Sequence, residues 1–173
     1  LQITRRARIM IQYTATDGLA VLLFQSPPVN AFSLGLLDEL LESVRRADAD
    51  PEVRAVILTG GPVHFSAGAD LALFRDLRGV DDAVRLSQHF QHVFEQIENS
   101  FKPVVAALAG HVMGGALELA LACHFRVAVA GSRFSTPEVR LGINPGAGGT
   151  QRLPRLIGVE AALDLLVSGQ SIN

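Results

Sequence analysis

Residues 110–120 read GHVMGGALELA, and residues 134–150 read FSTPEVRLGINPGAGGT. Each stretch places one acidic residue, Glu118 or Glu138, among apolar residues and glycines. Carboxylates are costly to bury, so a glutamate in such a setting calls for an explanation. The structural explanation is that each carboxylate caps a turn or pairs with one of three nearby arginines, Arg126, Arg133 and Arg140.

A third stretch favours a functional explanation. Residues 64–71 read HFSAGADL and lie upstream of both glutamates. FSAGADL, GGxxELA, PEV and PGAGGTQRL follow one another in this order, and the ordered set is highly specific although each piece alone is weak. The set resembles the enoyl-CoA hydratase/isomerase (crotonase) superfamily, and the resemblance runs from about Tyr13 to the end of the chain.

The resemblance implies an α/β fold, a spiral of ββα units. We expect residues 10–173 to form one crotonase-like acyl-CoA domain, and residues 1–9 to be upstream sequence or sequence added for expression. Residues 27–31 and 121–126 are similar to the hydratase half of multifunctional fatty-acid oxidation enzymes, in which a 3-hydroxyacyl-CoA dehydrogenase follows. By this comparison the last helices, which complete the acyl pocket and the trimer contact, are missing.

Composition indicates one compact domain. The 173 residues are 49% hydrophobic and 18% charged, which is typical of a globular protein. A net charge of −2 gives no electrostatic case for binding nucleic acid or an anionic membrane, and no uncharged apolar run approaches the roughly 20 residues of a membrane span. The single Cys123 lies in an apolar run, which predicts a buried, inert thiol in a reducing, cytoplasmic setting.

Apolar periodicity predicts the main elements. Two strands separated by Thr16-Asp17-Gly18 form a hairpin, and Ser33 begins a helix. Two further runs are apolar on both faces and therefore predict strands inside the sheet. The expected strands are residues 9–13, 19–24, 53–59, 103–107 and 125–130, and the expected later helices are 81–99, 114–123, 150–157 and 159–167.

The helix expected at residues 81–99 carries His89, His92 and Glu95, whose spacing brings the first two onto one face. A zinc site usually takes a further ligand from another part of the chain. Glutamines surround these residues, so we interpret the patch as a solvated helix face and expect no metal. The buried side of this helix is expected to consist of Val84, Phe90, Val93, Phe94 and Ile97.

Chemistry on an acyl thioester requires stabilisation of negative charge on the thioester oxygen. Two fixed backbone N–H groups serve this purpose, and the loss of one such donor typically costs about 10²–10³ in rate. By resemblance these donors are the amides of Ala69 and Gly115. A helix that begins at Gly114-Gly115 would also direct its positive end at the oxygen.

Hydration of a trans-2-enoyl thioester needs a base for water and a proton donor for Cα. Two carboxyl groups that share one water can do both, and burial with mutual repulsion raises at least one pKa. The resemblance implies that Glu118 activates the water and that Glu138 supplies the α-proton. Family isomerases usually keep only the residue that matches Glu138, so the pair favours hydration, with isomerisation as a side activity.

The remaining site residues also follow from the resemblance. Gly114, Pro137 and Gly146 are expected to shape the substrate pocket. No dinucleotide fingerprint or P-loop is present, so no cofactor is expected and coenzyme A enters as part of the substrate. Val29 replaces the lysine usual in its loop, which makes the phosphate contacts the least certain part of the site. The expected coenzyme A contacts are Ala67, Gly68, Asp70, Leu71 and Lys102.

Other functions stay open on the sequence. The same fold hosts isomerases, decarboxylases and thioester hydrolases, and a truncated chain could be a non-catalytic subunit. A serine peptidase is disfavoured because His64 occupies the first glycine position of a Gly-x-Ser-x-Gly context around Ser66. The partners expected are an acyl-CoA thioester, copies of the same chain in a trimer or hexamer if the last helices are present, and a dehydrogenase domain on the full-length chain.

Overall fold

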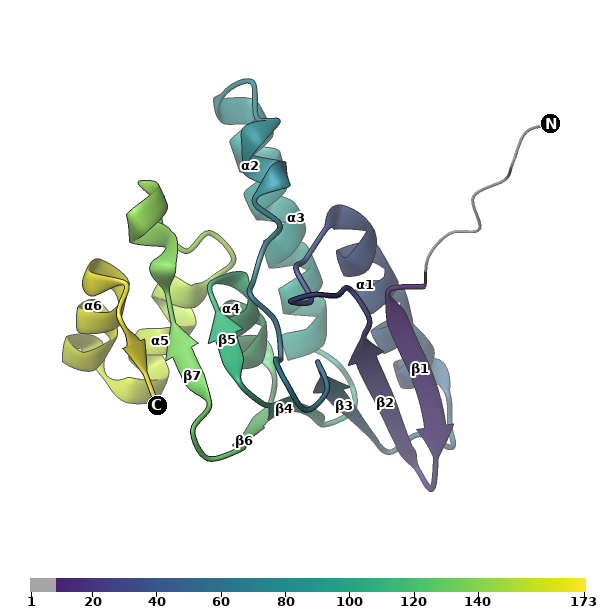
Figure 1. Cartoon of the computed structure of the whole chain (residues 1–173). Coiled ribbons are helices and arrows are strands. Elements are labelled where there is room, and N and C mark those ends of the chain that lie inside the picture. Colours follow the sequence, from purple (N-terminus) through teal and green to yellow (C-terminus); the bar gives the residue numbers. More distant parts are fainter. Residues whose placement is uncertain (1–8) are drawn as a thin grey trace.

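The computed structural model describes residues 9–173. It contains a five-stranded sheet in the order β1-β2-β3-β4-β6, and a smaller sheet in the order β5-β7-β8 (Figure 1). The large sheet consists of β1 (Ile11–Thr16), β2 (Leu19–Phe24), β3 (Ala55–Thr59), β4 (Val104–Leu108) and β6 (Phe125–Ala128). The small sheet consists of β5 (His111–Met113), β7 (Arg133–Ser135) and β8 (Ser171–Ile172).

Helices fill the connections between these strands. The first two long helices, α1 (Leu34–Ala49) and α3 (Val80–Glu98), pack against each other, and α3 also packs on α4 (Gly115–Ala122). The remaining elements are α2 (Ala72–Arg75), the 3-10 helix η1 (Pro137–Leu141), α5 (Gly149–Ile157) and α6 (Val159–Ser168). This mixed α/β architecture agrees with the fold class expected from the sequence.

The predicted hairpin is confirmed. β1 pairs with β2 in an antiparallel register, although β1 begins at Ile11 and not at Ile9. Asp17 and Gly18 both have positive φ, 50° and 82°, as a two-residue turn of the primed type requires. At the other end of the hairpin, the backbone amide of Gln25 donates to the oxygen of Met10 at 2.8 Å, and the side chain of Gln25 donates to that of Gln12.

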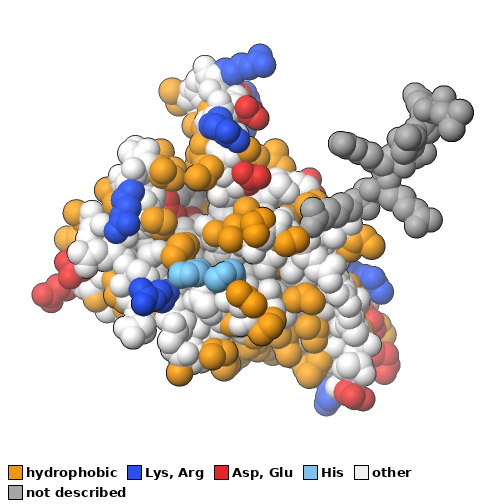
Figure 2. Space-filling model, viewed as in Figure 1, with side chains coloured by type: hydrophobic (Ala, Val, Ile, Leu, Met, Phe, Trp, Pro, Cys, Tyr) orange, Lys and Arg blue, Asp and Glu red, His pale blue; other side chains and the backbone are white. Residues whose placement is uncertain are grey.

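The prediction that β3 and β4 lie inside the sheet is confirmed. Both strands have parallel neighbours on each side, and Val56 pairs with Val104. One face of these strands is fully buried under helices, whereas the other face, which includes Ile57 and Val105, is only half-buried. Figure 2, in the view of Figure 1, shows apolar side chains across the lower part of the molecule, and exposed apolar residues of β6 include Phe125 and Val127.

Ser33 begins α1 as predicted, because its Oγ accepts a hydrogen bond from the amide of Leu36 at 3.2 Å. α3 corresponds to the helix expected at residues 81–99, with Phe90, Val93, Phe94 and Ile97 buried. The prediction that Val84 lies on the buried side of this helix is wrong, because Val84 is 46% exposed. The first half of α3 projects with α2 beyond the two sheets, so no core is available there for Val84 (Figure 1).

The sequence missed the short elements of the second sheet. β5 and β7 have only three residues each, too few to show a period of two, and residues 137–141 form a 3-10 helix that carries Glu138. The helices α4, α5 and α6 and the strand β6 lie where they were expected, within two residues at their ends. Residues 1–8 of the expected upstream segment lie outside the described residues.

Two further findings apply to residues 9–173. No helix among them is long and apolar enough to cross a bilayer. No group of three or more histidine, cysteine, aspartate or glutamate side chains is placed to hold a metal ion there. His89 instead lies beside Asp38, with its Nε2 atom 3.1 Å from the carboxylate Oδ1.

Candidate active site

Glu118 is held in the interior by a helix that is buried on all sides. Every residue of α4 is buried, as expected of a helix without a polar face, and Glu118 itself is only 3% exposed. Its Oε1 atom accepts hydrogen bonds from the amides of Ala147 at 2.8 Å and Gly149 at 2.7 Å. The carboxylate is therefore fixed by a loop about thirty residues further along the chain.

Glu138 is buried differently. It lies on η1, is 8% exposed, and its buried Oε2 atom has no hydrogen-bond partner among the described residues. Gly114 permits its position, because a Cβ at Gly114 would lie 2.9 Å from Glu138 Oε1 and the φ of Gly114 is 55°. Pro137 approaches the same point, with its Cδ atom 3.9 Å from that hypothetical Cβ.

The two glutamates face one cavity of about 260 Å³. Ala69, Gly115 and Gly146 also line it. The remaining wall is mainly apolar and comes from α2, α3 and the segment after η1. Its members are Phe74, Leu77, Ala83, Leu86, Ser87, Phe90, Ile143 and Asn144.

The environment shifts both carboxyl pKa values upward. Burial raises the pKa of Glu138 to about 7, and the nearby Glu118 carboxylate adds to this rise. Burial also raises the pKa of Glu118, but the hydrogen bonds from Gly149 and Ala147 and the charge of Arg152 oppose that rise. Glu138 can thus hold a proton near neutral pH, whereas the amides that bind Glu118 limit the rise of its pKa.

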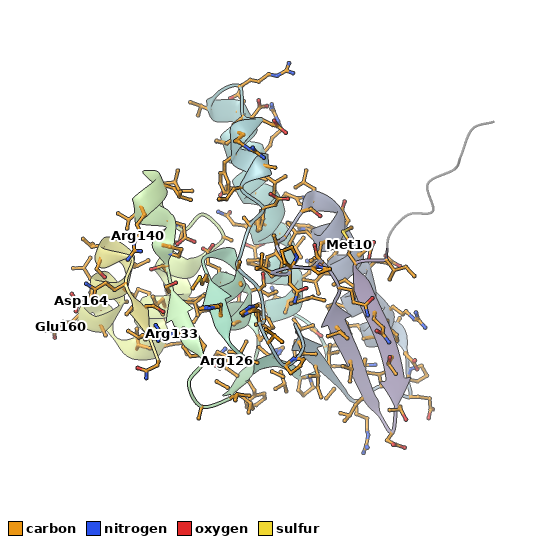
Figure 3. All side chains as sticks on the ribbon, in the orientation of Figure 1. Met10, Arg126, Arg133, Arg140, Glu160 and Asp164 are labelled. Carbon is orange, nitrogen blue, oxygen red and sulfur yellow. The ribbon has the colours of Figure 1, made fainter. Side chains whose placement is uncertain are left out.

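The arginine partners considered from the sequence are not found. Arg126 donates from its Nη1 to the backbone oxygens of Ala120 at 3.0 Å and Cys123 at 2.6 Å. Figure 3 shows Arg126, Arg133 and Arg140 spread along β6, β7 and η1. Among residues 9–173, neither glutamate forms an ion pair with an arginine.

The structure brings together the two amides that the sequence selected as oxyanion donors. A Cβ built on Gly115 would lie 3.5 Å from the nitrogen of Ala69, and one built on Gly68 would lie 3.1 Å from the nitrogen of Gly115. Within the described part of the chain, neither amide donates a hydrogen bond to a protein acceptor. Gly68 has a φ of 93° and packs so closely on the oxygen of Met113 that no side chain would fit.

The other residues of the loop at positions 64–71 lie next to Ala69. Ala67 is exposed and donates its N–H to the oxygen of Val29 at 2.9 Å. Asp70 accepts from the amide of Ala72 at 2.9 Å, and Leu71 is 57% exposed. Ala67 and Leu71 are thus exposed on either side of Ala69, and Asp70 is half-buried.

Lys102 is not brought into this group. It precedes β4, whereas the site lies beyond the carboxyl ends of the parallel strands. Its Nζ donates to the backbone oxygens of Ala47 and Asp50 at the end of α1. Lys102 therefore neutralises the negative end of a helix dipole, and the expected coenzyme A contact at this position is not supported by its placement.

Sequence reasoning missed part of the site. The sequence predicts a helix from residue 150 and no partner for Glu118 in the turn before it, yet the amides of Ala147 and Gly149 in that turn bind its carboxylate. Phe90 was placed in the core, and it also lines the cavity. The glycine spacing of this turn contained a signal, because a Cβ at Gly149 would lie 2.9 Å from the Cγ atom of Glu118.

Comparisons with known proteins agree with the fold and the motifs. Residues 14–173 match the family model described as enoyl-CoA hydratase/isomerase. The chain is 44% identical over 163 residues to a probable enoyl-CoA hydratase of Bacillus subtilis, covering 94% of this chain and 63% of the relative. It is 44% identical over 164 residues to the human peroxisomal bifunctional enzyme, covering 94% of this chain and 22% of the relative.

A solved structure of similar fold gives the same result. The crystal structure of an enoyl-CoA hydratase from Thermoplasma volcanium superposes with a TM-score of 0.91 at 31% identity, over 96% of this chain and 66% of that one. The chain thus spans just under two thirds of the lengths of this structure and of the Bacillus relative. The family match, the ordered motifs and the crotonase fold together show that this chain belongs to the enoyl-CoA hydratase/isomerase family.

Proposed function

We propose that the site hydrates trans-2-enoyl-CoA, adding water across the double bond next to the thioester, as a step of fatty-acid β-oxidation. The observation that carries the proposal is the pair of buried glutamates with raised pKa values that face one cavity beside two unpaired backbone amides. The names of the relatives support the same chemistry. The substrate enters as the coenzyme A thioester, and no other cofactor is required.

The proposed reaction begins with polarisation of the thioester. Its oxygen accepts hydrogen bonds from the amides of Ala69 and Gly115, which stabilises the enolate-like charge that develops when Cβ is attacked. Both donors belong to fixed backbone, so they need no reorganisation during the reaction. The positive N-terminal end of α4 adds to this stabilisation.

The two carboxyl groups then divide the proton transfers. The Glu118 carboxylate orients a water molecule and takes its proton while the water oxygen bonds to Cβ. Protonated Glu138 gives its proton to Cα, so the double bond becomes a single bond and one water has been added. The different pKa environments of the two groups support this assignment of base and acid.

Isomerisation is the competing activity within the family, and one observation favours it as a side reaction. A double-bond shift needs one group that removes and returns a proton, and Glu138 has a pKa of about 7 and a free Oε2 atom. Glu118 distinguishes the two reactions, because only hydration needs a second carboxylate to hold water. Loss of Glu118 should therefore abolish hydration more completely than isomerisation.

The test follows the loss of the enoyl absorbance when the purified chain meets crotonyl-CoA. Glu118→Gln and Glu138→Gln should each lower the rate by at least about 10²-fold, because each removes one proton-transfer group. Glu160→Gln on an exposed position of α6 is the matched control and should retain the wild-type rate. Circular dichroism should show the same fold in all four proteins.

The outcomes separate the alternatives. A wild-type rate in either glutamine variant would remove that glutamate from the mechanism. If crotonyl-CoA binds but the wild-type chain does not hydrate it, the proposed activity is wrong for this chain. If coenzyme A thioesters do not bind, a non-catalytic role becomes the better interpretation.

A further inference from the structure

The loop at residues 146–149, which binds Glu118, is itself fixed by side chains of α3 and α5. Its amides at Ala147 and Gly149 point to the carboxylate, and its carbonyl groups point to other helices. The oxygen of Gly146 accepts a hydrogen bond from Ser87 Oγ and another from Gln91 Nε2, each at 2.7 Å. Gln91 also donates to Ser87 Oγ at 3.1 Å, so the two side chains on α3 act on the loop as one unit.

A second anchor comes from α5. Arg152 donates from Nη1 to the oxygen of Ala147 at 3.0 Å. The rest of its guanidinium is bound by Glu98 on α3, with Nη2 at 2.7 Å from Oε2 and Nε at 3.2 Å from both carboxylate oxygens. The Arg152 side chain is only 14% exposed, so this ion pair is shielded on one side from solvent.

Little else fixes this loop. It connects η1 to α5 over residues 142–148, and three of its residues are glycines. Gly148 has a φ of 105°, and a Cβ there would lie 2.2 Å from Arg152 Nη1. The glycines make the backbone permissive, and the side chains of Ser87, Gln91 and Arg152 select one conformation of it.

We propose that Gln91, Ser87 and the Arg152–Glu98 pair are positioning residues for Glu118, which they act on through the loop at residues 146–149. The inference rests on the proposed function only in that Glu118 is taken as the base. None of these four side chains needs to touch substrate for this role. They keep the two loop amides directed at one carboxylate oxygen, which leaves the other oxygen for water.

The proposal has an electrostatic consequence. The charged or titratable groups that act on Glu118 are Glu138 on η1 and Arg152 on α5, and Arg152 is itself paired with Glu98 on α3. The residues of α3 nearer the cavity and the loop, Ser87, Phe90 and Gln91, are uncharged. Both the loop amides and the charge of Arg152 lower the pKa of Glu118. Removal of Arg152 should therefore raise the pKa of Glu118 for two reasons: the positive charge is lost, and the loop amides are no longer held in place.

The experiment compares Arg152→Gln with Arg155→Gln in the full chain. Arg155 lies on the same helix, is exposed, and within the described residues hydrogen-bonds only to Gln151. The ¹³C-labelled glutamate carboxyl signals are titrated by NMR, and Glu118→Gln identifies the Glu118 signal. We expect a higher midpoint for Glu118 in Arg152→Gln, no change in Arg155→Gln, and partial recovery in Arg152→Lys.

Kinetics give the second reading. Arg152→Gln and Gln91→Leu should lower kcat for crotonyl-CoA by roughly 10- to 100-fold with little change in KM, because a displaced base slows the chemical step more than binding. The acidic limb of the kcat–pH profile should move to higher pH in Arg152→Gln, in parallel with the NMR midpoint. Gln91→Leu keeps every charge and therefore isolates the loop contact.

The outcomes distinguish this proposal from the proposed function, because the titration needs no turnover. If the wild-type chain does not hydrate crotonyl-CoA but Arg152→Gln and the charge-conserving Gln91→Leu both raise the Glu118 midpoint, the positioning role stands and the hydratase proposal falls. If the wild type is active and Arg152→Gln leaves both midpoint and kcat unchanged, the positioning role is overturned. An unfolded Arg152→Gln leaves Gln91→Leu to decide in the same two measurements, and wild-type values there overturn the role.

Discussion

At the scale of single residues, Glu118 and Glu138 have the same side chain but differ in hydrogen bonding and in what sets their pKa values. Both are buried, and burial is the first cause of each raised pKa. Two backbone amides bind one oxygen of Glu118, whereas the buried Oε2 of Glu138 has no hydrogen-bond partner within residues 9–173. Hydrogen bonds to a carboxylate favour its charged form, so the two environments differ in the direction that the proposed roles of base and acid require.

The pKa of Glu138 predicts a pH-dependent contribution to stability. Its pKa is about 7 in the folded protein, against an ordinary value of 4.5, so between these values the folded state holds a proton that the unfolded state has released. The contribution of Glu138 is therefore most favourable below about pH 4.5 and is lost as the pH rises through about 7. Glu138→Gln should become more stable relative to wild type over this range, by up to roughly 3 kcal/mol at about pH 8, a limit that solvent screening of this carboxyl lowers.

Urea unfolding at several pH values between about 5 and 8 measures this difference. The control is Glu160→Gln, at an exposed position where the charge is solvated in both states, so its difference from wild type should not vary with pH. A difference between Glu138→Gln and wild type that stays constant from about pH 5 to about pH 8 would contradict the buried, proton-holding state of Glu138.

At the scale of elements, one asparagine fastens the loop after β2 to the loop that carries Ala69. Asn30 is 8% exposed, and its Nδ2 donates to the oxygens of Gly60 at 3.0 Å and Phe65 at 3.2 Å. Its own backbone oxygen accepts from Ser66 Oγ at 2.7 Å, and Ser66 Oγ accepts in turn from the amide of Gly68 at 3.0 Å. The position of Gly68, next to the oxyanion donor, thus depends on a residue 38 positions earlier.

Asn30→Ala should destabilise the protein by about 2–3 kcal/mol, because it leaves buried carbonyl groups without donors. It should also lower the rate of crotonyl-CoA hydration. Asn30 has a φ of 52°, so Asn30→Gly separates backbone strain from the lost hydrogen bonds and should recover only a small part of the stability. Denaturant unfolding measures both effects.

The matched control for this prediction is Asn99→Ala at the end of α3. Asn99 also donates from Nδ2 to a backbone oxygen, that of Glu95 at 2.8 Å, but the bond is exposed. Its loss should cost less than about 1 kcal/mol, because water replaces the donor. Equal losses at Asn30 and Asn99 would show that the buried contacts of Asn30 do not hold the loop.

At the scale of the whole molecule, local stability should decrease from the sheet to the projecting helices. The buried residues of α3 all lie between Phe90 and Ile97, and α2 has none (Figure 1). The strands β2, β3 and β4 by contrast carry fully buried side chains and have partners on both sides. Segments with few buried contacts open with little free energy.

Hydrogen exchange followed by mass spectrometry checks this distribution. Amides of α2 and of residues 80–86 should exchange at least about 100-fold faster than those of residues 90–98 and of β3. Crotonyl-CoA should slow exchange in α2 and the first half of α3, because Phe74, Leu77 and Leu86 line the cavity. Uniform exchange along α3 would contradict the expectation, and ligand protection elsewhere would place the substrate at another site.

The sequence alone determined much of this protein. Apolar periodicity located the hairpin, the internal strands and the long helices, since these depend on contacts close in the chain. The ordered motifs around Ala69, Gly115, Glu118 and Glu138 identified the family and selected four residues that the fold brings to one cavity. Local pattern also misled at Val84, where periodicity predicts a buried side but the helix extends past the core.

Only the tertiary structure decided how the site is held. Glu118 depends on amides 29 and 31 residues away, and the loop that provides them depends on α3 side chains more than 50 residues earlier. Lys102 likewise precedes β4, and the parallel direction of the strands places it at the end of the sheet opposite to the site. Such contacts join segments that are far apart in the sequence and therefore produce no local pattern. Their partners are fixed by the packing of the whole chain.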